Sequence, residues 1–368
     1  MDEGLDVTDA QPATALLQGY EHVPDTTATT LQVRDRGKIM RPNSQGLIVE
    51  PDDGLEPVLE FIQTAEKSLL IKQFRFIEDS LTQAVIDRMS AGVDVRIMLN
   101  PKRSRGDRVN DETYERFKNE GIDVQWTNPK FYVTHEKSVV ADNRAALVAT
   151  FNLHHKYFTK TRDYGIITHD PHQVAQIIEA FDADWEHRDW APATYDGLLW
   201  SNANSRLQMA HFIDTAKHRL DIQHPKYVDA VILDHIAAAA QRGVKVYVLC
   251  GGRHGISDWD ILDTFASLRT LGRFGVKVHK QKNLRLHAKL LIADNQHALI
   301  GSMNIDRNAF DWRRELGITI SDPGVVARLK GIFDADWDLS RHYHPPDPLD
   351  PSQHVETDFP HDDDLVHE

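Results

Sequence analysis

The sequence lacks the features that mark several classes of protein. It has a single cysteine, Cys250, which excludes an intramolecular disulfide and is expected to be a small core residue. No segment approaches the roughly 18 consecutive apolar residues of a membrane-spanning helix. The acidic start, residues 1–6, has no apolar run behind it that would form a secretory signal. These absences favour a cytoplasmic protein, for which any membrane association would be peripheral.

An excess of positive charge is also lacking, since the net charge is −14. The segment after Arg341 contributes −8 and residues 1–45 contribute −3, so the body of the chain is close to neutral. This distribution argues against a broad nucleic-acid-binding surface but permits a locally basic cleft. The proline-rich acidic segment 342–368 is expected to be a disordered tail. Its five histidines are expected to be solvated, with weak metal binding as the alternative.

What the chain does contain is an internal repeat. Its 368 residues, 41% hydrophobic and 27% charged, describe an ordinary globular protein of about two domains. Phe181-Asp-Ala-Asp-Trp185 recurs as Phe333-Asp-Ala-Asp-Trp337, an offset of 152 residues. Upstream, Phe61-Ile-Gln-Thr-Ala65 has its counterpart in Phe212-Ile-Asp-Thr-Ala216 at an offset of 151. The chain is therefore a duplication of one unit.

Each half alternates between apolar strand-like runs and segments with helical spacing. The first half predicts strands at 46–49, 68–76 and 94–99 and helices at 57–67 and 80–91; both halves predict a proline-started helix, at 171–185 and at 323–337. This alternation predicts a duplicated α/β sandwich whose two halves have mixed or parallel sheets flanked by helices. We expect an N-terminal extension at 1–45, a first half at 46–196, a second half at 197–341 and the tail at 342–368. The functional site is expected at the pseudo-two-fold interface between the halves.

The repeat also duplicates a set of reactive residues. The motifs His135-Glu-Lys137 and His287-Ala-Lys289 lie 152 residues apart, and each is followed at matched spacing by an aspartate, an asparagine and an acid. On a strand, alternation would place the His and the Lys on one face, where they could converge on a single group. Two ammonium groups and two amides would neutralise the charge on a phosphodiester. One imidazole would attack phosphorus, forming a covalent phosphohistidine, and the other would protonate the leaving alcohol.

We therefore predict a metal-independent phosphodiesterase or transferase that needs no cofactor. The acids Asp163 and Glu315 would each orient one imidazole. Activity is expected to be bell-shaped in pH, because one imidazole must be neutral and the other protonated. For Asp142 and Asp294 a structural role at a strand end is favoured over chemistry. The predicted catalytic residues are His135, Lys137, Asn152, Asp163, His287, Lys289, Asn304 and Glu315, with Thr150 and Ser302 as substrate-binding hydroxyls.

These motifs resemble those of the phospholipase D superfamily, H-x-K-x4-D-x6-G-S-x-N. The second half fits fully, whereas the first has Ala149-Thr150 in place of Gly-Ser. Within the superfamily, Asn304-Ile-Asp306 resembles bacterial cardiolipin synthases and related phospholipases, although Arg307-Asn-Ala309 departs from the usual Arg-Ser that follows. The resemblance implies a phospholipid substrate, a monomer that supplies both motifs, His135 as nucleophile and His287 as general acid and base.

Other features have two interpretations each. The basic segments 101–106 and 251–255 follow equivalent strands and could guide an anionic substrate, or they could be ordinary exposed turns. Adjacent His154 and His155 would diverge, which disfavours a metal site. The aromatic residues Trp190, Tyr195 and Trp200 could contact a membrane interface, but packing of the linker between the halves is favoured.

Two other functions compete with phospholipid cleavage. A nuclease would use the same chemistry, but the near-neutral body and the absence of a basic, aromatic stripe count against DNA or RNA as a substrate or partner. A catalytically degenerate binding module would require the departures in the first motif to be disabling. Retention of both His, both Lys and both Asn argues against this third alternative.

Overall fold

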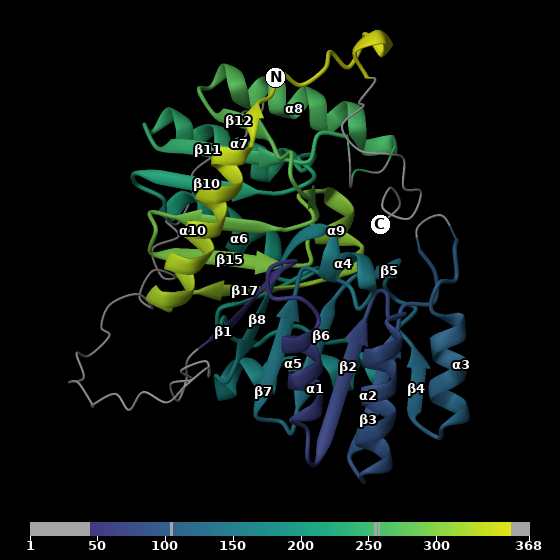
Figure 1. Cartoon of the computed structure of the whole chain (residues 1–368). Helices are drawn as coiled ribbons and strands as arrows, with labels where there is room; N and C mark the ends of the chain where they lie inside the picture. Colours follow the sequence, from purple (N-terminus) through teal and green to yellow (C-terminus); the bar gives the residue numbers. More distant parts are fainter. Residues whose placement is uncertain (1–44, 104–105, 254–255, 257, 355–368) are drawn as a thin grey trace, which may run out of the picture. The chain divides into compact units, whose positions relative to one another are not determined.

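The computed structural model describes residues 45–103, 106–253, 256 and 258–354 (Figure 1). The N-terminal extension 1–44 and the tail beyond 354 lie outside the described residues. The strands and helices of the first half are β1 Gly46–Glu50, α1 Glu56–Gln63, β2 Ser68–Gln73, α2 Asp79–Ser90, β3 Asp94–Leu99, α3 Asp111–Asn119, β4 Asp123–Trp126, β5 Val133–Thr134, β6 Lys137–Ala141, β7 Ala145–Ala149, α4 His155–Thr159, β8 Thr161–Thr168 and α5 Pro171–Trp185.

The second half repeats this succession. Its elements are β9 Leu198–Trp200, α6 Ser205–Thr215, β10 Arg219–Gln223, α7 Ala230–Gln241, β11 Lys245–Cys250, α8 Ile261–Arg273, β12 Lys277–Lys280, β13 Arg285–Leu286, β14 Leu290–Ala293, β15 His297–Gly301, α9 Arg307–Asp311, β16 Arg313–Arg314, β17 Leu316–Ile320, α10 Pro323–Leu339 and β18 Arg341–His342. The predicted α/β sandwich with two similar halves is confirmed.

The two sheets have the same topology. The first has the strand order β1-β8-β7-β6-β2-β3-β4, and the second, read from its β9 edge, has the order β9-β17-β15-β14-β10-β11-β12-β18. Strands β2, β3 and β4 of the first sheet run parallel to one another, and so do β10, β11 and β12 of the second. The other neighbouring strands that the two sheets have in common are antiparallel. Both sheets are therefore mixed.

Local signals explain where the elements begin and how they are held. Helices α5 and α10 have proline in the first turn, and the preceding Asp170 and Asp322 accept hydrogen bonds from two backbone N–H groups each. Asp142 accepts hydrogen bonds from the backbone N–H groups of residues 66–68, and Asp294 does so from residues 217–219. The structural role predicted for these two aspartates is confirmed.

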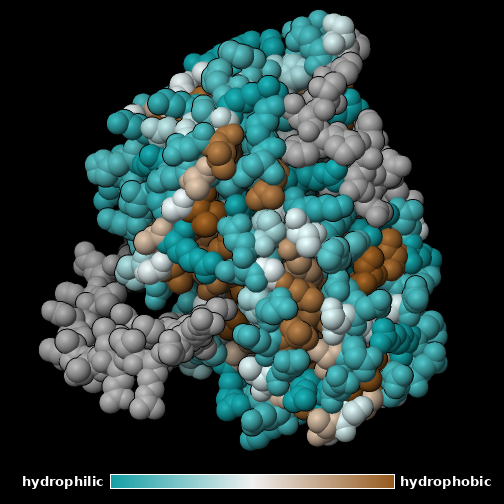
Figure 2. Space-filling view, viewed as in Figure 1, coloured by the Kyte–Doolittle hydropathy of each residue, from teal (hydrophilic) through white to brown (hydrophobic). Residues whose placement is uncertain are grey.

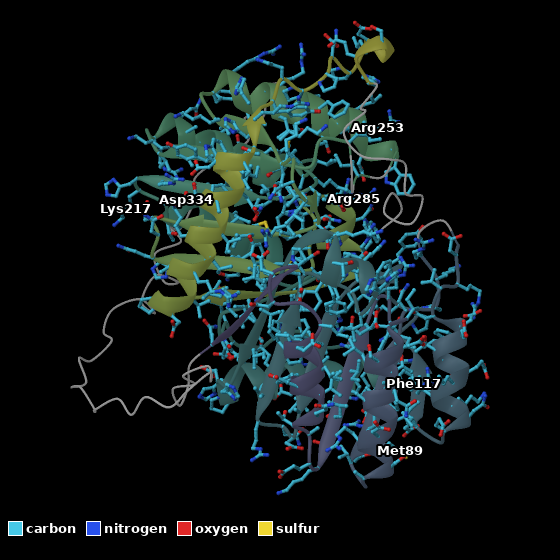
Figure 3. The ribbon with its side chains drawn as sticks, in the orientation of Figure 1. Met89, Phe117, Lys217, Arg253, Arg285 and Asp334 are labelled. Atoms are coloured by element: carbon cyan, nitrogen blue, oxygen red, sulfur yellow. The ribbon has the colours of Figure 1, made fainter. Side chains whose placement is uncertain are left out.

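Three apolar clusters separate the layers of the fold. One lies against α1, α2 and the outer face of the first sheet and includes Phe61 and Phe117, the latter labelled in Figure 3. Another lies against α6, α7, α8 and the outer face of the second sheet. The third contains α5 and α10 together with residues of both sheets, such as Val140 and Ile300. The two halves thus share one core.

The structure differs from the sequence prediction near each reactive motif and after the second half. His135 and Glu136 are not part of a strand but lie between β5 and β6, because β5 pairs with the other half while β6 pairs within its own sheet. Residues 342–354, expected to be disordered, begin with β18 at the edge of the second sheet, and Arg269 donates to the carbonyl of Pro345.

The length and apolar character of a helix decide whether it can span a membrane. None of the described helices combines the length and apolar character needed to cross a bilayer. On the face drawn in Figure 2, hydrophilic residues predominate and apolar residues are interspersed among them.

Candidate active site

Two short strand pairs connect the halves immediately before the reactive histidines. Strand β13, which begins at Arg285 (labelled in Figure 3), pairs in parallel with the start of β8, with Leu286 opposite Arg162. Strand β5 pairs in parallel with β16, with Thr134 opposite Arg314. The residues that follow these pairs are a histidine on one chain segment and an acid on the other. Each histidine therefore lies beside the acid of the opposite half.

The imidazoles and acids are therefore paired crosswise. His135 Nδ1 lies 2.9 Å from Glu315 Oε2, and His287 Nδ1 lies 2.6 Å from Asp163 Oδ1. In both cases the acid engages Nδ1, which fixes the tautomer and leaves Nε2 as the nitrogen available for chemistry. Each reactive dyad thus consists of one residue from each half, so neither half forms one alone.

All of the residues predicted for the site are buried, and they converge on one region. Lys137 Nζ donates to the carbonyl of His135 at 2.6 Å, and Lys289 Nζ donates to that of His287 at 2.7 Å. The Lys289 ammonium is also 3.0 Å from His287 Nε2. The ten side chains that are removed from solvent together are His135, Lys137, Thr150, Asn152, Asp163, His287, Lys289, Ser302, Asn304 and Glu315.

The two predicted substrate-binding hydroxyls make hydrogen bonds within the protein. Thr150 Oγ1 donates to Asp163 Oδ1 at 2.6 Å and accepts from the backbone N–H of Tyr164. Ser302 Oγ donates to the carbonyl of Leu316 at 3.3 Å and accepts from the backbone N–H of Leu316 at 3.1 Å, next to Glu315. The role of these hydroxyls in binding substrate stays a prediction, and in the structure Thr150 also holds the acid that orients His287.

The Ala149 departure in the first motif is accommodated by the sheet. Ala149 pairs with Gly165 in the register that pairs Gly301 with Gly317 in the second half. At Gly301 an added Cβ would lie 2.6 Å from the Gly317 Cα, so that position tolerates no side chain. The first half keeps the same strand pairing with alanine, and Asn152 is buried as Asn304 is.

The His135 dyad is poised to hold a neutral imidazole. Burial, followed by the charges of Lys137 and Arg313, lowers the pKa of His135 well below its usual value. Burial raises the pKa of Glu315 to about 7 against the opposing effect of those cations. His287 is also close enough to His135 for a charge on one imidazole to disfavour a charge on the other.

The His287 dyad has a different balance. Burial would raise the pKa of Asp163, but the charge and hydrogen bond of His287 and the hydrogen bond from Thr150 bring it below its usual value. Burial lowers the pKa of His287 to about 3, although the Asp163 carboxylate acts in the opposite direction. Burial also lowers the pKa of Lys289 to about 7. At neutral pH the imidazole of His287 is therefore uncharged, although the ionised acid beside it opposes the lowering of its pKa.

Two further ion pairs cross between the halves and were missed in the sequence. Arg162, the residue before Asp163, binds both oxygens of Asp336 at 2.8 and 3.1 Å. Arg314, the residue before Glu315, binds both oxygens of Asp184 at 2.9 and 2.6 Å. A signal was present, since the arginines and the aspartates of the Phe-Asp-Ala-Asp-Trp repeats all recur at the offset of 152.

Aromatic rings that the sequence did not single out pack against the two imidazoles. Phe74 contacts His135 edge-on with ring centroids 4.7 Å apart, and Tyr157 contacts His287 at 4.9 Å. Neither ring has an aromatic counterpart in the other half, where Pro225 and Ala309 stand at the matched positions. Comparing the two halves therefore could not have identified them.

Glu50 is a buried carboxyl beside the His287 dyad. It pairs with Asp163 in the β1–β8 register, is fully buried, and neither of its side-chain oxygens has a hydrogen-bond partner. Burial and the charge of Asp163 raise the pKa of Glu50 to about 9. At neutral pH this residue is therefore protonated, and it adds no charge to the dyad.

Replacing Glu50 with glutamine is expected to stabilise the protein increasingly as the pH rises. The raised pKa means that unfolding releases a proton between about pH 4.5 and 9, so the wild type loses stability over that window. Glutamine does not titrate in this window, so the free energy of unfolding of the variant should rise relative to that of the wild type by at most about 1.4 kcal/mol per pH unit. Urea unfolding at pH 5 and pH 8 measures the difference. The matched control is Glu60→Gln, on the exposed face of α1; an equal gain in both variants would contradict this account.

The remaining sequence predictions have mixed outcomes. Trp200 is fully buried, and Trp190 packs on it with ring centroids 4.9 Å apart, which confirms the predicted packing of the linker for these two residues. A buried Trp200 cannot contact a membrane, whereas Tyr195 is exposed. His154 caps α4 by accepting from the backbone N–H of Lys156. In the first basic segment Arg103 pairs with Asp107, whereas residues 104–105 and 254–255 lie outside the described residues.

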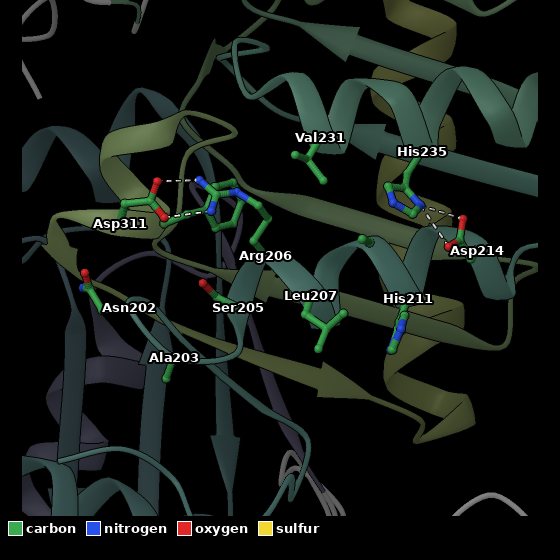
Figure 4. Close-up of a pocket in the computed structure, with 12 residues that line it drawn as sticks. Asn202, Ala203, Ser205, Arg206, Leu207, His211, Asp214, Val231, His235 and Asp311 are labelled. Carbon is green, nitrogen blue, oxygen red and sulfur yellow. Dashed lines mark hydrogen bonds and ion pairs between the residues drawn. The ribbon is translucent and has the colours of Figure 1, made fainter. Parts of the chain in front are cut away.

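A surface pocket of about 670 Å³ lies at α6, α7 and α9, away from this chemistry (Figure 4). Two ion pairs line it, Arg206 with Asp311 at 2.7 Å and His235 with Asp214 at 2.9 Å. It contains none of the predicted site residues. Within the described ranges no group of three or more His, Cys, Asp or Glu side chains is placed to hold a metal ion.

Comparison with known proteins yields a family and a fold. The sequence model described as "Cardiolipin synthase, PLD-like domain" matches residues 58–185 and again 209–337. A cardiolipin synthase of Staphylococcus aureus is 25% identical over 345 residues, covering 81% of this chain and 68% of the relative. Cardiolipin synthase A of Pseudomonas aeruginosa is 24% identical over 345 residues, with coverages of 83% and 69%. The chain thus spans about two thirds of the length of these relatives.

Solved structures with a similar fold have low sequence identity. Phosphatidylserine synthase of Haemophilus influenzae has a TM-score of 0.63 at 13% identity, covering 79% of this chain and 85% of that one. Polyphosphate kinase of Porphyromonas gingivalis has a TM-score of 0.64 at 16% identity, covering 83% of this chain but 51% of the kinase. These similarities support the fold of the two-sheet body.

Proposed function

Because the chain belongs to the phospholipase D superfamily, in the family of cardiolipin synthase PLD-like domains, and is an enzyme of that type, we propose that it cleaves a phospholipid phosphodiester and passes the phosphatidyl group to an alcohol or to water. The observation that carries the proposal is the crosswise pairing of His135 with Glu315 and of His287 with Asp163. Relatives named for cardiolipin and phosphatidylserine synthesis support phospholipid as the substrate class.

In the first step His135 Nε2 attacks phosphorus while the bond from phosphorus to the leaving oxygen breaks. His287 Nε2 gives its proton to that oxygen, so the head-group alcohol departs neutral and a phosphohistidine remains. In the second step His287 takes the proton of the acceptor hydroxyl as its oxygen attacks phosphorus. The P–N bond breaks, its electron pair returns to His135, and both residues regain their starting states.

The different environments of the two dyads support this division of roles. A nucleophile must be neutral, and burial together with neighbouring cations disfavours a charged His135. A general acid must hold a proton; burial lowers the pKa of His287 to about 3 and the Asp163 carboxylate opposes that effect, so His287 would be protonated once the charge of a bound phosphodiester adds to that of Asp163. Lys137, Lys289, Asn152 and Asn304 would stabilise the charge that grows on the phosphoryl oxygens. A phosphate group would also attract the Lys289 ammonium away from His287 Nε2.

A product assay with phosphatidylglycerol vesicles tests the proposal. We expect release of glycerol, and with added ethanol we expect a phosphatidyl alcohol, both unaffected by a chelator. Cleavage of single-stranded DNA in place of lipid would favour the nuclease alternative. Absence of turnover on both, together with absence of a labelled phosphate adduct after brief exposure to substrate, would contradict the enzymatic proposal and favour a binding module.

The pH dependence of kcat/KM is expected to show an alkaline limb near pH 7. The lowered pKa of Lys289 means that its ammonium is present below about pH 7 and lost above it. Activity should then fall by about tenfold per pH unit, because a positive charge on the phosphoryl oxygens is removed. In Lys289→Arg, which stays charged, the limb should move to higher pH even if the maximum rate falls. An unchanged limb in that variant would assign it to another group.

A further inference from the structure

Arg313 lies at the site but belongs to neither set of paired residues. It is the first residue of β16, and its carbonyl is held by Ser201 Oγ at 2.7 Å and Asn202 Nδ2 at 2.6 Å. Successive side chains on an extended strand point to opposite faces. Arg314 points away from the histidines to Asp184, so Arg313 shares the face of Glu315. The charge of Arg313 acts on both His135 and Glu315, which agrees with this placement.

Among the described residues no carboxylate forms a direct ion pair with the buried Arg313 guanidinium, although its charge acts on Glu315 and Asp306. Arg313 is 2% exposed, and its Nε and Nη1 atoms have no hydrogen-bond partner. Three other buried cations of the described chain do form direct ion pairs: Lys72 and Arg314 bind Asp184, and Lys226 binds Asp306 and Asp260. An uncompensated buried charge destabilises a fold, so this arrangement is costly unless a ligand completes it.

The matched position in the opposite half does not hold a cation. Thr161 occupies the matched position, 152 residues earlier, and its hydroxyl donates to Asp163 Oδ2 at 2.7 Å. Asp163 therefore receives hydrogen bonds from two threonines and His287, whereas Oε1 of Glu315 has no partner. The pseudo-two-fold symmetry is broken at Arg313, on the side of the site that holds His135.

We propose that Arg313 binds a non-bridging phosphoryl oxygen of the substrate on the His135 side of the site. A planar guanidinium can engage phosphate through two N–H groups, which suits the free Nε and Nη1 donors. Phosphate binding would supply a directly paired anion and hold phosphorus next to His135. The inference rests on the proposed function for the identity of the ligand as an anionic phosphodiester. It adds a third cation, beside Lys137 and Lys289, that belongs to one half alone.

Binding of inorganic phosphate, measured by calorimetry without lipid, tests this role. Arg313→Gln is expected to weaken phosphate binding at least about tenfold, which corresponds to the loss of one charge-assisted hydrogen bond. Its melting temperature should equal or exceed that of wild type, because a buried charge without a direct ion pair is removed. Arg313→Lys, which keeps the charge, should recover part of the affinity. Arg307→Gln is the control, since Arg307 is in the same segment but 78% exposed.

The outcomes separate this inference from the proposed function. Weakened phosphate binding with retained stability supports Arg313 as a phosphate-binding residue even if no lipid is turned over. Unchanged phosphate binding in Arg313→Gln, or no binding of phosphate by the wild type at millimolar concentration, would overturn the inference even if lipid is cleaved. Loss of stability in Arg313→Gln without recovery in Arg313→Lys would also overturn it, by assigning a structural role.

Discussion

Replacing His135 with asparagine is expected to lower turnover by roughly four orders of magnitude or more, because the nucleophile that forms the covalent intermediate is removed. Replacing His287 with asparagine should cost about 10²- to 10⁴-fold with a phospholipid, since the leaving alkoxide then receives no proton. The two variants should nevertheless differ in kind. A diester with a p-nitrophenol leaving group needs little protonation, so it should still form the phosphate adduct in His287→Asn but not in His135→Asn.

Mass spectrometry of the acid-labile adduct distinguishes the two roles. The adduct is expected on His135 in the wild type and in His287→Asn, where it should persist because no base activates the acceptor. His297→Asn serves as a control, since His297 is exposed at the start of β15. An adduct on His287, or one that still forms in His135→Asn, would show that the roles of the two halves are reversed.

Replacing Asp184 with asparagine is expected to destabilise the protein by about 3–5 kcal/mol. The buried Asp184 carboxylate lies 2.7 Å from Lys72 Nζ and binds two nitrogens of Arg314, so its loss leaves two buried cations with reduced compensation. Lys72 keeps a contact with Glu136 at 3.1 Å, but Arg314 forms no ion pair with another carboxylate of the described residues. Urea unfolding monitored by fluorescence and circular dichroism measures the change.

The same helix α5 offers a matched control. Asp182, two residues earlier, pairs with Arg96, and both side chains are partly exposed. Because partly exposed ion pairs contribute little, Asp182→Asn should cost at most about 1 kcal/mol. Activity should also fall more in Asp184→Asn, since Arg314 precedes the acid that orients His135. Equal effects of the two substitutions on stability would refute the idea that the buried pair holds the halves in register.

The sequence predicted the elements well where local signals are strong. Strand β3 and helix α5 have the expected bounds, because a continuous apolar run marks one and an Asp-Pro start marks the other. The predicted strand through His135 was wrong, because its break depends on β5 pairing with a strand 180 residues away in the other half. Periodicity within a segment carries no information about such a partner.

The candidate site shows a similar division. The duplicated spacing identified the His, Lys, Asn and acid residues, but it could not say which acid faces which imidazole. Only the parallel pairing of β5 with β16 and of β13 with β8 made that choice. Glu50 and Arg313 could not be found by comparing the halves, since Ser201 and Thr161 stand at the matched positions.

By itself the sequence determined that this protein is a duplicated α/β fold with two sets of groups suited to a phosphodiester, because residue type and spacing are local properties that repetition makes visible. The tertiary structure alone decided that each dyad joins both halves, that Thr150 holds Asp163, and that the two sides carry unequal charge. Those outcomes depend on burial and on contacts between residues that are distant in the chain, which set pKa values and hydrogen-bond partners only once the two halves share a core.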